Sequence, residues 1–314
     1  TIAVQRDGSR YRIELAGGPV EMDRDVLLQW TPVAGSEPQA AYFGEKVGEH
    51  HYGLLMLVPP VAAPVVVPRE LVFVIDTSGS MGGVSIEQAR ASVRRALRQL
   101  RPDDYFNIIE FNTNHRTLFA VPLQATRHNV GRASEFVRQL HASGGTEMLP
   151  ALREALSGQE ELHAGRLRQV VFITDGAVGN EVALYEEIAG KLGDARLFTV
   201  GIGSAPNGWF MRKAADFGRG THTVIGDLSE VGPRMDALFE ALAAPVATDI
   251  AVEWPAATET WPERAPDLYR GEPLLLAVRF RGGTPAGMVK VTGLLGGQQW
   301  TRQVAVDANA LEGH

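Results

Sequence analysis

Cysteine is absent from the 314 residues of the chain, which excludes disulfide bonds, thiolate metal ligands and cysteine nucleophiles together. The absence is compatible with the cytosol, and equally with a bacterial cell surface, where free thiols are a liability. No apolar run approaches the roughly 18 residues that a membrane-spanning helix needs, so no membrane span is expected. The chain starts without methionine and without a signal peptide, so we interpret it as an excised fragment whose lack of a targeting segment says little about location.

Basic residues are fewer than acidic residues. The chain has 30 lysines and arginines against 37 aspartates and glutamates, with a formal net charge of −7 at pH 7. Binding to a nucleic-acid backbone requires a basic stripe, so we expect no nucleic-acid partner. Hydrophobic residues make up 45% and charged residues 21%, which is ordinary for a globular protein.

The motifs of several common catalytic sites are missing. No GxSxG sequence positions a serine nucleophile, and no GxxxxGK[ST] or GxGxxG loop opens a helix to hold a phosphate. The eight histidines are scattered. His50 and His51 are neighbours on a predicted strand, where adjacent side chains point to opposite faces and rarely share one zinc ion. We therefore expect no enzyme activity.

The middle of the chain, residues 69–244, alternates strand and helix patterns. The runs ELVFVID at 70–76 and QVVFITDG at 169–176 are continuously apolar before their polar ends, which is typical of strands buried on both faces of a parallel sheet. Apolar residues at helical spacing follow, first at Ile86, Ala89, Val93, Ala96 and Leu100. This alternation predicts an α/β domain with a doubly wound, mostly parallel, Rossmann-like sheet of six strands and helices on both faces.

The two flanks, residues 1–68 and 245–314, contain short strand patterns separated by glycine, proline and polar residues. Neither flank is obviously long enough to form a core alone. We expect them to pack together as one β-sandwich-like unit with the α/β domain inserted between them. The alternative is two independent flanking pieces, one of them truncated.

The sequence FVIDTSGSMGG at residues 73–83 places a carboxylate and two hydroxyl groups directly after a buried strand. In an extended segment, residues two apart point the same way, so Asp76, Ser78 and Ser80 are expected to converge just beyond the strand. A nucleophilic serine, a phosphate site and a metal site are the three chemistries that such a pattern suggests.

Two later segments bring similar groups to the same edge of the predicted sheet. Asp175 ends the second apolar strand, and Thr146 lies in the loop SGGTEM. Two carboxylates and three hydroxyls form an all-oxygen set of the kind that Mg²⁺ prefers. Two aspartates only just neutralise one divalent cation, so the metal keeps an open position that a carboxylate of a partner can complete.

The motifs DxSxS, GGT and TDG, in this order, resemble the von Willebrand factor A domain and its metal-ion-dependent adhesion site. In this sequence the matching residues are Asp76, Ser78, Ser80, Thr146 and Asp175. The resemblance implies that the two serines and the threonine contact the metal directly, and that the aspartates act directly or through water. The implied cation is Mg²⁺ or Mn²⁺, with Ca²⁺ as a further candidate.

Further segments are similar to particular groups of proteins that contain this domain. MDRDVLLQW at 22–30, YGLLMLVPP at 52–60 and FITDGAVGNE are similar to the inter-alpha-trypsin inhibitor heavy chains, in which a VIT domain precedes the A domain. Residues 1–68 would then be the end of the VIT region or the link from it. WPERAPDLYRGEPLLL at 261–276 is similar to bacterial sortase-anchored surface proteins, although no LPxTG sorting signal is present. These similarities imply an extracellular or cell-surface location.

The function we expect is a metal-dependent adhesion module whose cation is completed by an acidic group of a protein or glycan partner. The alternative is a structural scaffold of a surface protein, in which the metal mainly stabilises the fold. Asn112, Asn114 and Glu147 are candidate partner contacts at the rim. Turn chemistry alone would explain the asparagines, and Glu147 could instead cap the next helix or fill the open metal position.

Overall fold

The computed structural model describes residues 2–7, 10–15, 37–60, 68–157, 166–176, 180–203, 207–243, 247–269, 273–282, 285–295 and 298–306. Residues 1–33 and 34–314 are separate compact units. In the first unit, strands β1 (Ile2–Asp7) and β2 (Arg10–Leu15) pair antiparallel. The segment 22–30, which the sequence assigned to the VIT region, lies outside the described residues.

The centre of the second unit is a mixed, mostly parallel sheet in the order β11-β10-β9-β5-β6-β7, with β8 also pairing with β6. Its strands are β5 (Arg69–Asp76), β6 (Tyr105–Phe111), β7 (His115–Thr117), β8 (Leu123–Gln124), β9 (Leu167–Thr174), β10 (Arg196–Ile202) and β11 (Arg219–Ile225). In the part of the chain that the structure describes, the sheet has seven strands and not the predicted six, because the short β7 and β8 both pair antiparallel with β6.

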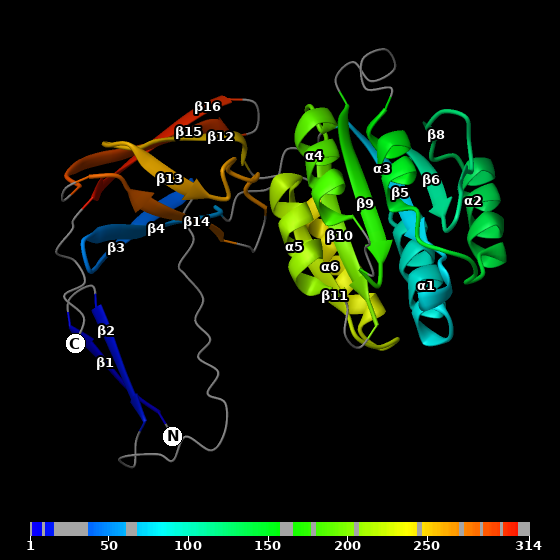
Figure 1. The fold of residues 1–314 in the computed structure, drawn as a ribbon, viewed down its shortest axis with the longest axis horizontal. Coiled ribbons are helices and arrows are strands. Elements are labelled where there is room, and N and C mark those ends of the chain that lie inside the picture. The colour runs from blue at the N-terminus through cyan, green and yellow to red at the C-terminus, as the bar shows by residue number, and fades with distance from the viewer. Residues whose placement is uncertain are drawn as a thin grey trace. The chain divides into compact units, whose positions relative to one another are not determined.

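Within the described residues, six α-helices and one 3-10 helix, η1 (Gly79–Met81), accompany this sheet. The α-helices are α1 (Val84–Arg98), α2 (Arg127–Gln139), α3 (Met148–Leu156), α4 (Glu181–Lys191), α5 (Gly208–Phe217) and α6 (Val231–Ala243). Figure 1 shows the strands running between them. Successive residues of β5 belong to different cores: Phe73 packs with α1, α2 and α6, whereas Val74 packs with α3, α4 and α5. All eight residues of β5 are buried. The sequence prediction of an α/β fold with helices on both faces is confirmed.

The described residues of the flanks form two further sheets, of which the first combines strands that precede and follow the central region and the second contains only strands that follow it. The first has the order β13-β14-β4-β3, with β3 (Gln39–Val47), β4 (His50–Val58), β13 (Thr258–Trp261) and β14 (Leu274–Phe280). The second has the order β12-β15-β16, with β12 (Ala247–Glu253), β15 (Gly287–Leu295) and β16 (Gln298–Val306). One apolar cluster takes residues from both sheets, including Leu55, Val291 and Trp300.

Residues 267–269 connect this cluster to the central sheet. Asp267, which is 3% exposed, accepts hydrogen bonds from Nε and Nη2 of Arg196 on β10, the second at 3.0 Å. Leu268 belongs to the apolar cluster of the flanking sheets. Tyr269 packs in the core of the central sheet, with its ring edge-on to Phe198 at a centroid distance of 5.4 Å. Three consecutive residues therefore join the two cores.

The buried ion pair predicts a large effect of one substitution. Asp267→Ala should lower the free energy of unfolding by about 3–5 kcal/mol, because it leaves the Arg196 guanidinium buried without its main partner. Asp249→Asn is the control, since Asp249 is an exposed residue 4.0 Å from Arg196 and asparagine tolerates its positive φ of 51°. Urea titration of both variants checks this, and equal effects would contradict it.

Candidate metal centre

The candidate site lies where β5 and β9 end side by side. These strands pair in parallel, so their carboxyl ends meet at the same edge of the sheet. The chain leaves β5 for α1, which covers one face, and leaves β9 for α4, which covers the other. Neighbouring strands whose connections leave to opposite faces form the switch point at which α/β sheets bind ligands.

Asp76 is the most firmly held residue of the site. Its side chain is fully buried; Oδ2 accepts a 2.6 Å hydrogen bond from the Thr174 hydroxyl, and Oδ1 accepts a 2.8 Å bond from the Ser78 backbone N–H. Burial raises the pKa of Asp76, and the nearby charge of Asp175 adds to this, although the bonds from Thr174 and Ser78 act in the opposite direction. Its negative charge is therefore costly unless a cation lies close to it.

Ser78 and Ser80 lie together, but not through the extended backbone that the sequence predicts, because Gly79–Met81 form the 3-10 helix η1 with Ser78 at its N-cap. Ser78 is buried and Ser80 is exposed, and their hydroxyl oxygens lie 3.0 Å apart. Adjacent oxygens around an octahedral Mg²⁺ at about 2.0–2.1 Å are about 2.8–3.0 Å apart. The same separation suits a hydrogen bond between the two hydroxyls, which a bound cation would replace. The oxygen pair thus fits a cation without moving apart.

The loop that carries Thr146 is bonded directly to this segment. Ser143 donates its backbone N–H to the carbonyl of Thr77 at 2.8 Å, and Gly79 donates its own to the carbonyl of Gly144 at 3.0 Å. Thr146 is half-buried two residues further on. The structure therefore brings the predicted third loop to the strand end that holds Asp76.

Asp175 completes the predicted set at the end of β9. Its side chain is half-buried, and its charge contributes to the raised pKa of Asp76. Its carbonyl accepts the backbone N–H of Asn207 at 3.2 Å, which ties it to the start of α5. The loops that carry all five predicted ligands thus meet at one edge of the sheet.

The three predicted rim residues differ in their roles. The Asn112 amide is engaged within the protein, because Nδ2 donates to the Thr77 hydroxyl at 3.3 Å and Oδ1 accepts the Asn114 N–H at 3.2 Å. These bonds show that Asn112 takes part in the turn, and its contact with a partner stays a prediction. Asn114 and Glu147 are exposed. Glu147 occupies the N-cap position of α3, but its side chain makes no capping hydrogen bond.

The sequence analysis missed a set of supporting residues behind the site. The Thr77 hydroxyl lies 3.3 Å from Glu110 Oε1 and 3.1 Å from the carbonyl of Phe111, and Arg116 bonds to the other oxygen of Glu110. Thr174 holds Asp76. The alternation of side chains along DTSGS predicts that Thr77 points away from the metal, but nothing in the sequence identifies its partners.

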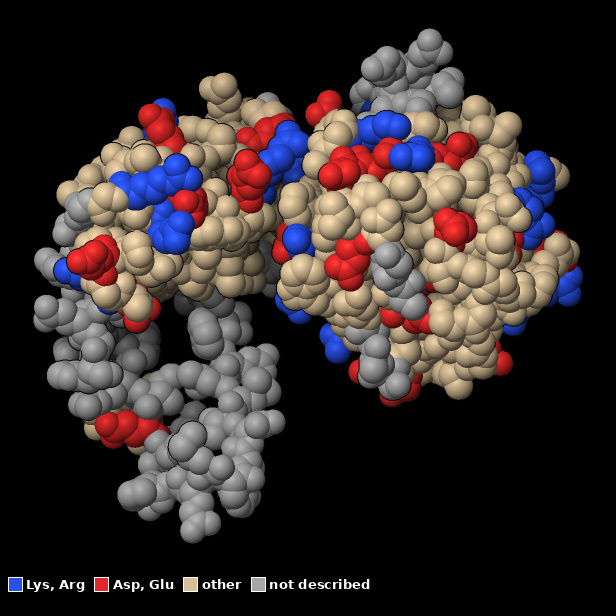
Figure 2. Space-filling view, viewed as in Figure 1, with Lys and Arg blue, Asp and Glu red and all other residues tan. Residues whose placement is uncertain are grey.

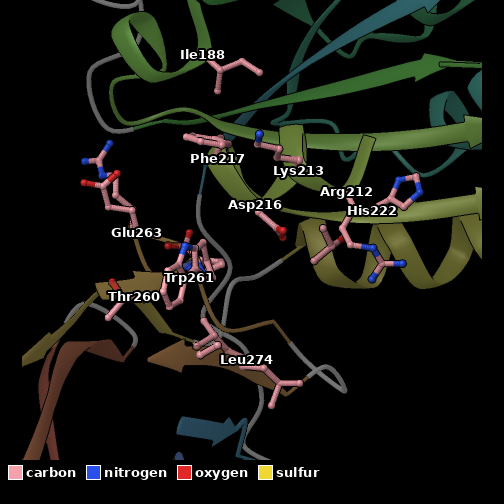
Figure 3. Close-up of a pocket in the computed structure, with 18 of the residues that line it drawn as sticks. Ile188, Arg212, Lys213, Asp216, Phe217, His222, Thr260, Trp261, Glu263 and Leu274 are labelled. Carbon is pink, nitrogen blue, oxygen red and sulfur yellow. The ribbon is translucent and has the colours of Figure 1, made fainter. Parts of the chain in front are cut away.

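A large pocket lies apart from the candidate metal centre. Its volume is about 1440 Å³, and Figure 3 shows Lys213 and Asp216 of α5 facing it together with Trp261 of β13. None of the five predicted metal ligands lines this pocket. Among the described residues, no group of three or more His, Cys, Asp or Glu could hold a metal. The candidate centre is instead a site of two carboxylates and three hydroxyls.

Two surface properties of the described residues bear on partners. On the face in Figure 2, basic and acidic side chains are interspersed and form no continuous basic stripe. Within the described part of the chain, none of the helices has the length and apolar character that crossing a membrane requires.

Known proteins with a similar sequence contain the same type of domain. Residues 69–224 match the family model of the von Willebrand factor type A domain. The chain is 30% identical over 228 residues to mouse inter-alpha-trypsin inhibitor heavy chain H3, covering 68% of this chain and 26% of that protein. It is 29% identical over 211 residues to human von Willebrand factor A domain-containing protein 5B1, covering 66% and 17%. The chain therefore spans about a quarter or less of these relatives.

Solved structures show the same fold. A von Willebrand factor type A protein from Catenulispora acidiphila superposes with a TM-score of 0.64 at 17% identity, covering 88% of this chain and 74% of that one. The ArnB paralog VWA2 from Sulfolobus acidocaldarius gives a TM-score of 0.55 at 16% identity, covering 85% and 74%. At these identities the likeness concerns the fold alone.

The raised pKa of Asp76 predicts a pH dependence of stability. The folded state holds the proton more tightly than the unfolded chain, so this stabilising contribution is complete below the ordinary pKa of 3.8 and is lost as the pH rises through the folded-state pKa. In EDTA, the unfolding free energy of the parent should therefore fall relative to that of Asp76→Asn as the pH rises above the ordinary pKa of Asp76. Urea titrations at several pH values measure this. A difference that does not change with pH would contradict it.

Proposed function

We propose that the von Willebrand factor type A domain formed by residues 69–224 is a metal-dependent adhesion module that catalyses no reaction. Domains of this type generally mediate protein–protein interactions or adhesion. The observation that carries the proposal is the pair of hydroxyl oxygens of Ser78 and Ser80, 3.0 Å apart beside the buried carboxylate of Asp76. Hydroxyl and carboxylate oxygens favour Mg²⁺ or Mn²⁺, with Ca²⁺ as a further candidate.

In this proposal, Ser78, Ser80 and Thr146 offer oxygen ligands, and the two aspartates supply the compensating charge. Asp76 acts mainly by position, because both its oxygens already accept hydrogen bonds from Thr174 and Ser78. When bound, the cation supplies a positive charge with an open coordination position. An acidic group of a protein or glycan partner completes that position, and the exposed Asn114 and Glu147 lie on loops where they would meet this partner.

The flanking sheets hold the domain in place. We propose that the parts of residues 1–68 and 245–314 that belong to the second unit form one β-sandwich-like unit beside the domain at 69–244, supported by the pairing of β4 with β14 and by the shared apolar cluster. Similarity to the inter-alpha-trypsin inhibitor heavy chain supports an extracellular or cell-surface location. The competing proposal is a scaffold in which the metal chiefly stabilises the fold, which is favoured by the direct bonds between the loops of the site.

Cation binding should stabilise the folded chain. At 100 times its dissociation constant, Mg²⁺ or Mn²⁺ should add about 2.7 kcal/mol to the free energy of unfolding relative to EDTA. Ser78→Ala and Asp175→Ala should each lose most of this gain, since each removes an oxygen ligand or a charge from the site. Thermal and urea unfolding in both conditions measure it. A gain of the same size in all three proteins would place the cation elsewhere.

Partner capture separates adhesion from scaffolding. With Mg²⁺, the parent should be retained on an acidic peptide or a carboxylate-bearing glycan such as polygalacturonate, and EDTA should release it. Asp175→Ala should abolish retention. Asp103→Ala, an exposed change just before β6 at the opposite end of the sheet, should leave it intact. Retention that survives both EDTA and Asp175→Ala would favour the scaffold.

A further inference from the structure

The short segment from Asn112 to Asn114, between β6 and β7, contributes none of the five predicted metal ligands. It nevertheless bonds to both loops that carry hydroxyl ligands. Asn112 reaches the first of these loops through its amide, which donates to the Thr77 hydroxyl at 3.3 Å. The segment also closes on itself, since the Asn112 backbone N–H donates to the carbonyl of Asn114 at 2.8 Å.

The second loop is bonded to this segment on both sides of Thr146. The N–H of Gly145, the residue before it, donates to the Thr113 hydroxyl at 2.8 Å. The N–H of Glu147, the residue after it, donates to the Asn112 carbonyl at 2.7 Å. The threonine expected to contact the metal is therefore fixed between two bonds that both end on the segment.

Gly144 shows how closely the Thr113 side chain approaches this loop. A Cβ atom at Gly144 would lie 2.7 Å from Thr113 Oγ1, and the φ of Gly144 is +76°. A side chain at this position is thus disfavoured both by the backbone conformation and by the Thr113 hydroxyl. The Thr113 hydroxyl therefore packs directly against the backbone of Gly144, at a place where only glycine leaves room for it.

We propose that Thr113 and Asn112 are positioning residues, which set the place of Thr146 at the metal centre and so determine how tightly the cation is held. This inference rests on the proposed function. Groups that orient metal ligands typically change affinity about 10- to 100-fold when they are replaced. Thr113 and Gly145 are both exposed, so the loss of their bond acts locally and leaves the core of the domain intact.

Hydrogen exchange in EDTA tests the positioning without any metal. Thr113→Val removes the acceptor oxygen at nearly constant shape, and should speed exchange of the loop around Gly145 while β5 keeps its protection. Thr113→Ser retains the oxygen and should restore the parent rate. Thr223→Val makes the same chemical change on the edge strand β11 and should leave the loop unchanged. Unaltered loop exchange in Thr113→Val would overturn the inference.

Titration with Mn²⁺ alone, followed by electron paramagnetic resonance, tests the consequence for the cation. Thr113→Val should weaken Mn²⁺ binding about 10-fold, and Thr113→Ser should bind like the parent. Equal affinity of the parent and Thr113→Val would overturn the inference while leaving the proposed function standing. A parent that binds no Mn²⁺ would overturn the proposed function and, with it, the assignment of Thr113 to metal positioning, whatever the exchange data show.

Discussion

The parallel pairing of β5 with β9, buried under helices on both faces, is the constraint from which the rest of the site follows. It places Asp76 and Asp175 at neighbouring strand ends, where burial and the charge of Asp175 both raise the pKa of Asp76. Two carboxylates in such a position repel each other, and a divalent cation is the simplest group that relieves both the repulsion and the desolvation. The two carboxylates at this edge of the sheet therefore favour a nearby positive charge. The hydroxyl oxygens of Ser78 and Ser80 have a separation that suits a bound cation.

The loops around this edge act together because their backbones are bonded to one another. Thr77 links them: its N–H donates to the carbonyl of Phe111, its carbonyl accepts from Ser143, and its hydroxyl accepts from Asn112. A shift of any one of these three segments thus disturbs the other two. The same principle operates at the opposite end of β10, where Arg196 and Asp267 join the central sheet to the flanking sheets. In both places, a few buried polar bonds fix the relation between segments that are far apart in the sequence.

Much of this arrangement could be predicted from the sequence, because it depends on strongly periodic patterns. The continuous apolar run of β5 predicts a strand buried on both faces. The spacing of Ser78 and Ser80 led us to expect that their hydroxyls meet, but a 3-10 helix, and not the expected extended segment, brings them together. The seven-stranded count was missed because β8 is only two residues long and carries no periodicity. The inward use of the Asn112 amide was not predictable either, since an asparagine in a turn looks the same whether its amide faces a neighbouring loop or a partner. Both the pairing of β8 with β6 and the orientation of the Asn112 amide depend on hydrogen bonds between segments distant in the sequence. The spacing of residues does not reveal such bonds.

The central claim is that a cation binds at the strand ends through Ser78, Ser80 and Thr146. Anomalous diffraction from a crystal of this chain grown with Mn²⁺ tests it most directly. We expect one strong anomalous peak bonded to the two serine hydroxyls, with the Asp76 and Asp175 carboxylates next to it. A map without a peak at this edge of the sheet, or with its main peak at a different set of residues, would contradict the account.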